Sequence, residues 1–493
     1  MIKQQVYFLG IVLFLMAVSA RASTAPLKLD QFLDQVLNQN KAAMGSVNIV
    51  QGSKERSLEG DAQVKPQLVA NATLNRDAQP LFSIFFPSTI GYGLAIERDT
   101  YSLGVQQNFD FGLNWSFNFN TLHTVATGLN NFSPTAPAFV EMWQIQPTLN
   151  MKFSLWRNFL GRELKSSLDL SESSALITHY SERYKLKSQL VDAENAYWRL
   201  VIARKALAIR KELLGRAQAL QAWSARRTQM SLGDKADAYQ ADAILELRTL
   251  ELQAAVDEER MASQAFNLAR GIAGDKVEAE LSELPIDEDG SLPALTKVGP
   301  RDDVLVAREN QKVAVATHVA AIEKLKPNLD LTGAVVMNGT NTNTGTAFSQ
   351  VTALSYPTTT VGLALTAPLD LGLVSRSKVG HEKESVGADW ILERKLFEEE
   401  QDWNEILLKF EESKRKFKLA ASIERLQKEK LTYERDRLLR GRTTTNMVIQ
   451  FEQDYSQAVL SKFLSQVEVT QIYAKMKLLG GSKFEAIDKE TTL

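Results

Sequence analysis

The chain has 493 residues, 44% of them hydrophobic and 24% charged, with a formal net charge of −2 and no cysteine. This length allows several domains, and the near-neutral charge balance argues against nucleic acid as a partner. The absence of cysteine excludes disulfides, thiolate metal sites and a lipid-modified N-terminal cysteine.

Residues 1–22 have the pattern of a secretory signal peptide. Lys3 supplies a short positive region, an apolar run covers residues 6–18, and Ala20 and Ala22 are the small residues of a cleavage site. We therefore expect an exported protein. After this segment, no stretch reaches about 18 consecutive apolar residues, so the pattern predicts no transmembrane helix there.

Residues 23–274 form the first of two similar halves. A helical pattern covers residues 29–65 and stops at Pro66, and strands are expected within residues 66–156. The clearest strand signal is at residues 105–120, where aromatic or apolar side chains alternate with small polar ones. An alternation of about 15 residues favours a lipid-facing barrel strand over a strand of a β-sandwich.

A long helical hairpin is predicted over residues 161–271. Its first helix carries two apolar stripes, one through Leu190 and the other through Ile202, so it needs neighbours on two sides. Gly233 permits a turn, and Asp234 is suited to cap the returning helix. A single helix of about 70 residues would be roughly 105 Å long.

The same order of elements then restarts. An acidic, proline-containing connector at residues 275–300 leads into a second half at residues 301–481. This half has a helix at 301–326, strands at 328–337 and 358–371, and a long helical hairpin at 374–479, before a C-terminal tail at 482–493. The sequence therefore predicts an internal two-fold repeat.

The two halves differ by an insertion. Pro66 and Pro327 lie farther apart in the sequence than Gly233 and Gly441 do, so extra residues lie between the strands of the first half, at about 77–140. The aromatic strand falls in this segment. It can belong either to a membrane barrel or to an additional external hairpin.

One copy of the chain can neither pair all of its strand edges nor cover all the apolar faces of its helices. About four strands cannot close a barrel, and an open strand edge is not viable in lipid. Long helices with two apolar stripes also need further helices around them. A symmetric oligomer that pools its strands into one barrel and its helices into one tube solves both problems. We expect a mixed α and β membrane protein that acts as a conduit.

Several stretches, taken in order, resemble the TolC-like outer-membrane efflux proteins. They are residues 29–40, 153–162, Gly233 with 237–241, 325–332, 367–372 and 437–457. The resemblance implies a homotrimer with a 12-stranded β-barrel, about four strands per chain, continued by a long periplasmic α-helical barrel. It also implies the outer membrane of a Gram-negative bacterium as location, with lipid around the barrel and the helical part in the periplasm.

The resemblance also implies a function and partners. The channel would passively conduct substrates exported by an inner-membrane pump or ABC transporter through a periplasmic adaptor, in efflux or type I secretion, without catalysis or a cofactor. The adaptor-docking tips carry over to Leu232, Gly233, Asp234, Arg440, Gly441 and Arg442. The periplasmic gate carries over to Asp237, Arg437, Thr443, Met447 and Gln450.

The gate departs from the family pattern. Relatives often carry acidic residues at the constriction, where this chain has Met447 and Gln450, and the three arginines named above stand nearby. One interpretation is a solvated helix end, where cations are favourable. The other is a latch, in which the arginines pair with Asp234 or Asp237 of a neighbouring hairpin.

Two other classes of function fit the sequence less well. An enzyme is disfavoured because the four histidines are scattered, and His381-Glu382 is not followed by the second histidine of a zinc-protease motif. A secreted coiled-coil structural or surface-layer protein would explain the long helices. It would not explain the duplicated strands or their aromatic alternation.

Overall fold

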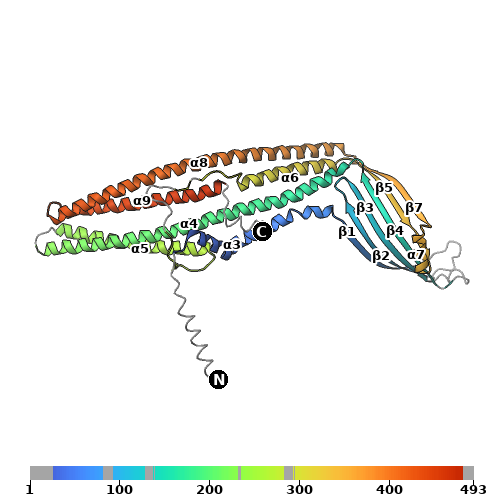
Figure 1. The fold of residues 1–493 in the computed structure, drawn as a ribbon, viewed down its shortest axis with the longest axis horizontal. Helices are drawn as coiled ribbons and strands as arrows, with labels where there is room; N and C mark the ends of the chain where they lie inside the picture. Colours follow the sequence, from blue (N-terminus) through green and yellow to red (C-terminus); the bar gives the residue numbers. More distant parts are fainter. Residues whose placement is uncertain are drawn as a thin grey trace, which may run out of the picture. The chain divides into compact units, whose positions relative to one another are not determined.

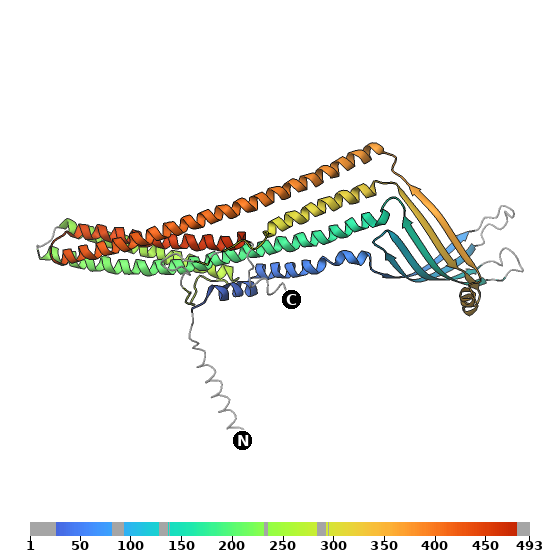
Figure 2. The same ribbon diagram turned by 45° about the horizontal axis from the view of Figure 1, so that its top comes forward.

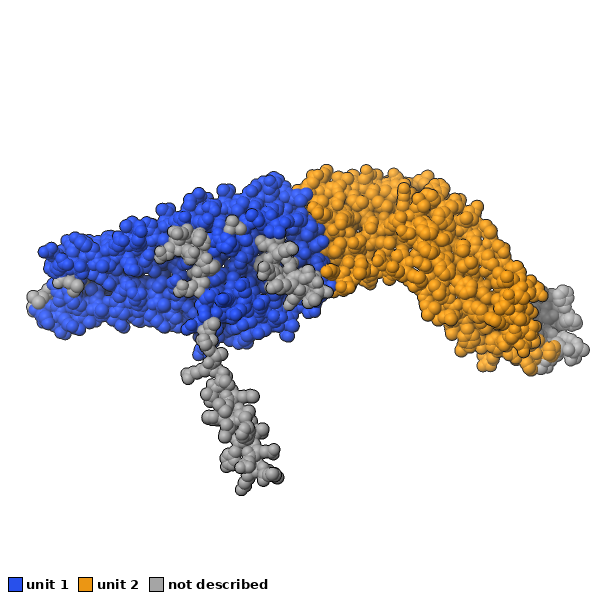
Figure 3. Space-filling view, in the orientation of Figure 1, with its two compact units in different colours: residues 1–51, 178–305, 394–493 blue, residues 52–177, 306–393 orange. Residues whose placement is uncertain are grey.

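The computed structural model describes residues 26–80, 93–127, 137, 139–230, 235–282, 292, 293 and 295–480. The predicted signal peptide and C-terminal tail lie outside these ranges, as do Leu232, Gly233 and Asp234. The fold is mixed α and β and largely helical. It divides into one unit of Met1–Gln51, Thr178–Leu305 and Arg394–Leu493 and another of Gly52–Ile177 and Val306–Glu393 (Figure 3).

Two helical hairpins dominate the chain (Figure 1). Helix α4 (Arg162–Gln229) precedes α5 (Lys235–Ala269), and α8 (Leu371–Leu439) precedes α9 (Thr445–Leu479). Helices α4 and α8 have 68 and 69 residues, so at ~1.5 Å rise per residue each is about 100 Å long. They contain no proline and are rich in Ala, Leu, Glu, Lys and Arg, which have high helix propensity.

Ion pairs join the two helices of each hairpin. Arg199 of α4 donates to Glu258 of α5 at 2.9 Å, and Lys430 of α8 lies 3.4 Å from Asp454 of α9. These side chains are partly exposed, so each pair contributes little by itself. These ion pairs fix which residues of the two antiparallel helices face each other in each hairpin.

The segment predicted as one helix over residues 29–65 contains three helices: α2 (Leu29–Gln39), α3 (Lys41–Arg56) and the 3₁₀ helix η1 (Glu59–Gln63). Asn40 causes the first break, since its backbone is extended with ψ 116°. Its side-chain oxygen accepts from the Ala42 amide at 2.9 Å, and its side-chain nitrogen donates to the Ala269 carbonyl at 2.9 Å. One asparagine therefore ends α2 and also caps α5.

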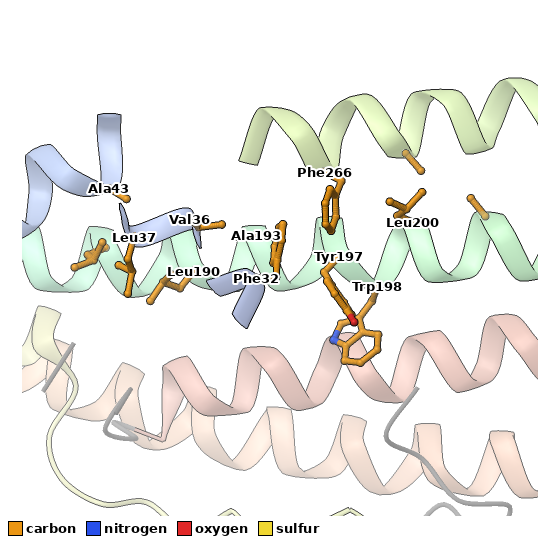
Figure 4. Close-up of a cluster of buried hydrophobic side chains, with 13 residues drawn as sticks. Phe32, Val36, Leu37, Ala43, Leu190, Ala193, Tyr197, Trp198, Leu200 and Phe266 are labelled. Carbon is orange, nitrogen blue, oxygen red and sulfur yellow. The ribbon is translucent and has the colours of Figure 1, made fainter. Parts of the chain in front are cut away.

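The main core of the first unit surrounds Tyr197 of α4. Figure 4 shows Phe32 from α2 and Phe266 from α5 pointing toward its ring. The Phe32 and Phe266 rings stack with centroids 4.3 Å apart, and Phe32 lies 5.4 Å from the Tyr197 ring. The buried tyrosine hydroxyl donates to the Leu27 carbonyl at 2.6 Å and accepts from the Ser282 amide at 3.0 Å. It therefore ties two distant segments to α4.

The second unit contains one antiparallel sheet (Figures 1 and 2). Its strands are β1 (Gln67–Pro80), β2 (Gly93–Asn108), β3 (Leu113–Thr127), β4 (Phe139–Ser154), β5 (Asn328–Met337), β6 (Gly339–Asn341) and β7 (Pro357–Thr366). The strand order is β1-β2-β3-β4-β5-β7, and the short β6 pairs with β4. Two further helices are α6 (Asp302–Lys324) and α7 (Thr344–Thr352), and α7 packs on the sheet through Ala347 and Val351.

The sheet has more strands than the four or so per chain expected for the barrel, since it has seven, six of them with ten residues or more. Part of the difference arises at residues 105–120, where a turn at residues 109–112 divides one predicted strand between β2 and β3, and the short β6 adds another strand. Gly112 adopts φ 88°, and the Phe109 amide donates to the Leu113 carbonyl at 2.8 Å. A turn of four residues preserves the alternation of faces, so a period of two cannot reveal it.

Removing the Tyr197 hydroxyl should destabilise the first unit. Tyr197→Phe keeps the ring packing and the bond from the Ser282 amide to the Leu27 carbonyl, but removes the bonds of the hydroxyl to both groups, and should cost about 1–3 kcal/mol. Urea unfolding of the purified full chain, followed by helical circular dichroism, measures the change. Tyr239→Phe, at an exposed position on α5, is the matched control and should have little effect. Equal midpoints for both variants would contradict the assigned role of the hydroxyl.

Candidate functional site

The turn between α8 and α9 is the part of the expected docking tip that the structure describes. The Gly441 amide donates to the Leu438 carbonyl and the Arg442 amide to the Arg437 carbonyl, both at 2.9 Å. This pair of bonds is a Schellman helix end, which needs a left-handed residue one position past the cap. Gly441 provides it with φ 67°. The glycine therefore terminates α8 for a local backbone reason.

The N-terminus of α9 is capped by Thr444. The Thr444 backbone is extended, and its hydroxyl accepts from the Met447 amide at 3.4 Å. Thr443 is half-buried, whereas Met447 and Gln450 are exposed in the first turns of α9. A Schellman end and an N-cap on opposite sides hold the turn in one conformation. The two predicted gate residues of α9 are thereby presented on its surface.

The three arginines of the tip make contacts with α8 or with the turn that follows it. Arg437 donates to Glu434 at 2.9 Å and to the Arg442 carbonyl at 3.2 Å. Arg440 lies 3.6 Å from Asp436. The structure thus brings Arg437 and Arg442 together, and the two carboxylates that pair with arginines here belong to α8.

Asp237 lies on the other hairpin, in the first turn of α5, and is half-buried. A carboxylate at this position is favoured by the positive end of the helix dipole. It is the one acidic member of the expected gate that the structure describes. The remaining acidic residue of the expected tip, Asp234, is outside the described residues.

A carboxylate shared by both hairpins was not predicted. Glu452 of α9 pairs with Arg216 of α4 at 3.4 Å and with Arg435 of α8. Glu452 is mostly buried, and the guanidinium of Arg216 also lies over the Tyr455 ring, 5.6 Å from its centroid. One carboxylate therefore joins the first hairpin to the second. The sequence carries no signal for this contact, because Arg216 and Glu452 are 236 positions apart.

A second polar contact joins the hairpins closer to their turns. Gln240 of α5 donates to the side-chain oxygen of Asn446 of α9 at 2.9 Å. Between the hairpins lies a cleft of about 700 Å³. Its wall is largely apolar, with Leu213, Leu220 and Trp223 from α4, and the Arg216–Glu452–Arg435 cluster lies along it. The hairpins therefore meet through a few polar contacts beside an incompletely filled space.

The surroundings shift the pKa of two groups at this contact, Arg216 and Tyr455. Burial lowers the pKa of Arg216, but its hydrogen bond to Glu212 and the charge of Glu452 outweigh burial, so the pKa is raised. Burial, followed by the nearby charge of Glu424, raises the pKa of Tyr455. Both groups therefore keep their ordinary protonation state at neutral pH.

Within the described ranges, no three His, Asp or Glu side chains are grouped so that they could hold a metal ion. Nor does any described helix combine the length and apolar character needed to cross a membrane.

The sequence matches no family model and no curated protein. Solved structures do match. They include the outer-membrane channel OprN, with TM-score 0.63 and 15% identity over 92% of this chain and 90% of that chain. The outer-membrane protein VceC from Vibrio cholerae has TM-score 0.65 and 13% identity, over 92% and 96%. The open outer-membrane channel MtrE of Neisseria gonorrhoeae has TM-score 0.64 and 16% identity, over 93% and 90%.

These similarities extend over more than nine tenths of this chain. At such low identity they establish the fold and leave activity to be argued from the residues. The resemblance inferred from the sequence is confirmed at this level. The chain has the fold of the TolC-like outer-membrane channels.

Proposed function

We propose that the protein is an outer-membrane channel that passively conducts substrates exported by an inner-membrane pump through a periplasmic adaptor. The main observation behind this proposal is a sheet with one apolar and one polar face, in a chain that has a channel fold. One face exposes large apolar side chains, among them Leu68 of β1 at 74% and Leu363 of β7 at 69%. A water-soluble surface rarely exposes such a continuous apolar face, whereas lipid requires one.

The edges of the sheet support an oligomer. In the described residues β1 pairs only with β2, and β7 only with β5, so each has an unpaired edge. Lipid offers no hydrogen bonds to such an edge, so β7 of one copy would pair with β1 of the next until a barrel closes. We propose a homotrimer built in this way, with an internal repeat in each chain.

The helices also expose apolar side chains that copies would cover. Leu250 of α5 and Leu408 of α8 are each 68% exposed, and Leu419 of α8 is 66% exposed. Burial of apolar surface drives association, so these side chains support the pooling of helices into one periplasmic tube. The runner-up, a secreted coiled-coil structural protein, would use these helices but leaves the apolar face of the sheet uncovered.

The hairpin turns are the proposed contact sites for the adaptor. They comprise Leu232, Gly233, Asp234, Arg440, Gly441 and Arg442. The proposed gate is formed by Asp237, Arg437, Thr443, Met447 and Gln450. The rigid turn after α8 supports docking, since a preformed surface loses little conformational entropy on binding. The cargo is chosen by the pump.

Cell fractionation tests the channel proposal. The protein should be found in the outer membrane as an SDS-resistant trimer that dissociates on heating, because its strands would pair between copies. Sucrose-gradient fractions analysed with and without boiling measure this. Recovery in a soluble filament fraction would support the coiled-coil alternative instead.

Charge reversal at the tip tests the arginine latch. If Arg442 pairs with an acidic residue of a neighbouring hairpin, Arg442→Glu should increase the open population about fivefold at low salt. Single-channel conductance in planar bilayers measures it. Lys428→Glu, an exposed reversal elsewhere on α8, is the control. Unchanged conductance of the Arg442 variant would leave the arginines as a solvated helix end.

The shared carboxylate should hold the hairpins together. Glu452→Gln weakens its pairs with both Arg216 and Arg435 and should increase the open population at least about tenfold, as expected for a charged hydrogen bond of about 1.5–3 kcal/mol. Bilayer conductance again measures the effect. Asp454→Asn is the matched control, because Asp454 pairs with Lys430 within the second hairpin only. Equal effects of the two variants would argue against coupling between hairpins.

A further inference from the structure

The hairpin formed by β2 and β3 is not an appendage of the sheet. Strand β2 pairs with β1 from Gln67↔Gln106 to Pro80↔Gly93. Strand β3 pairs with β4 from Leu113↔Phe153 to Thr127↔Phe139. The hairpin therefore lies between β1 and β4 along the whole length of both, as Figure 1 shows. We propose that β2 and β3 are lipid-facing wall strands, so that each copy contributes six long strands to the barrel.

Rows of paired residues show that the apolar face continues across the hairpin. One row runs Leu68, Val105, Phe117, Leu149 and Val335 from β1 to β5. It has no polar member at β2 or β3. Leu103 of β2, two positions along, is 56% exposed on the same face. An external hairpin in water would have no reason to carry this face in register with its neighbours.

The opposite face is uncharged at the same level, and its side chains on β1 to β4 are polar. A row there runs Gln67, Gln106, Ser116, Asn150 and Ala334. Gln106 donates to Gln67 at 3.1 Å, and Asn150 donates to Ser116 at 3.3 Å. The side chains of β2 and β3 therefore bond to those of β1 and β4. This is the lining expected of a water-filled lumen.

The apolar face ends at one level on all four strands. Beyond it, His123 of β3 lies 2.8 Å from Glu141 of β4 and 3.8 Å from Asp99 of β2, and Arg76 of β1 pairs with Glu97 of β2. Charged side chains on a lipid-facing surface are costly at the bilayer centre and tolerated near its interfaces. A common boundary across the four strands indicates that they cross the same layer.

At the other end, the β2–β3 turn is built into the connection that leads to α4. Gly161 adopts φ 72°, and a side chain there would collide with the Asp110 carbonyl of the turn. A side chain at Gly112 would meet the Asn158 carbonyl oxygen at 2.9 Å. The Gly112 carbonyl accepts from the Ser154 amide at 3.4 Å. The two glycines thus let the backbones approach closely, and the β2–β3 turn packs at a fixed position against this connection.

The strand count follows from this placement and rests on the proposed function. Two additional strands preserve the antiparallel alternation, so β7 can still pair with β1 of the next copy. Three copies with six long strands each give a wall of eighteen strands. Barrel diameter grows roughly linearly with strand number, so the lumen would be about one and a half times as wide as that of a twelve-stranded barrel. Such a wall, uncharged across the row described above, suits bulky hydrophilic cargo.

Cysteine labelling tests the placement, since the chain has no native cysteine. Leu103→Cys and Phe117→Cys report on the apolar face of the hairpin, and Ser102→Cys and Asn118→Cys on its polar face. Leu363→Cys and Thr360→Cys are the references on β7. In native membranes, positions 103 and 117 should react with a lipid-soluble maleimide and resist a water-soluble one, as position 363 does. Positions 102 and 118 should react with the water-soluble reagent, as position 360 does.

The references separate the two possible failures. If positions 103 and 117 react with the water-soluble reagent while 363 does not, the hairpin is external and this inference is overturned. If 363 also reacts with it, the proposed channel itself fails. Electron cryomicroscopy of the unmodified protein in detergent provides a count that needs no substitution. Six long strands per copy are expected, and a ring with four strands per copy would contradict the inference.

Discussion

Backbone hydrogen bonding at the two sheet edges is the constraint on which the rest of the structure depends. In the described sheet, every strand from β2 to β5 is paired on both sides, whereas β1 and β7 are each paired on one. On one face the exposed side chains of these two strands are apolar, so this face is unsuited to contact with water. In the proposed oligomer, the same constraint requires an even number of inserted strands. A single strand would reverse the direction of one edge and prevent antiparallel closure between copies.

The helical unit is organised by a different principle. Its long helices form from local propensity, but specific side chains determine which helices meet. Tyr197 draws the segments at Leu27 and Ser282 onto α4, and Glu452 joins α4 to the second hairpin. At the level of Glu452 and toward the turns, the hairpins enclose a cleft and are joined by Glu452 and by the bond from Gln240 to Asn446. A tight core at one place and a sparse ion-pair contact at another are the arrangement expected where one part stays fixed and another moves.

Local patterns predicted much of the secondary structure for physical reasons. The absence of proline and the choice of residues favour the long helices, and alternation favours the strands. The turn at residues 109–112 escaped detection because four residues preserve the alternation. The break at Asn40 escaped because its stabilisation comes from the Ala269 carbonyl, a group more than two hundred positions away. The expected tip residues Gly441 and Arg442 lie in a capped turn, while the contact at Glu452 was not foreseen.

By itself, the sequence determined which segments are helical or extended and which face of each strand is apolar, because both properties depend on residues a few positions apart. It also indicated the family fold through the order of weak motifs. The tertiary structure alone decided that β2 and β3 lie between β1 and β4, and that Arg216 and Arg435 share Glu452. Strand order and ion pairing between hairpins depend on which distant surfaces come together when the chain folds. Periodicity carries no information about that choice.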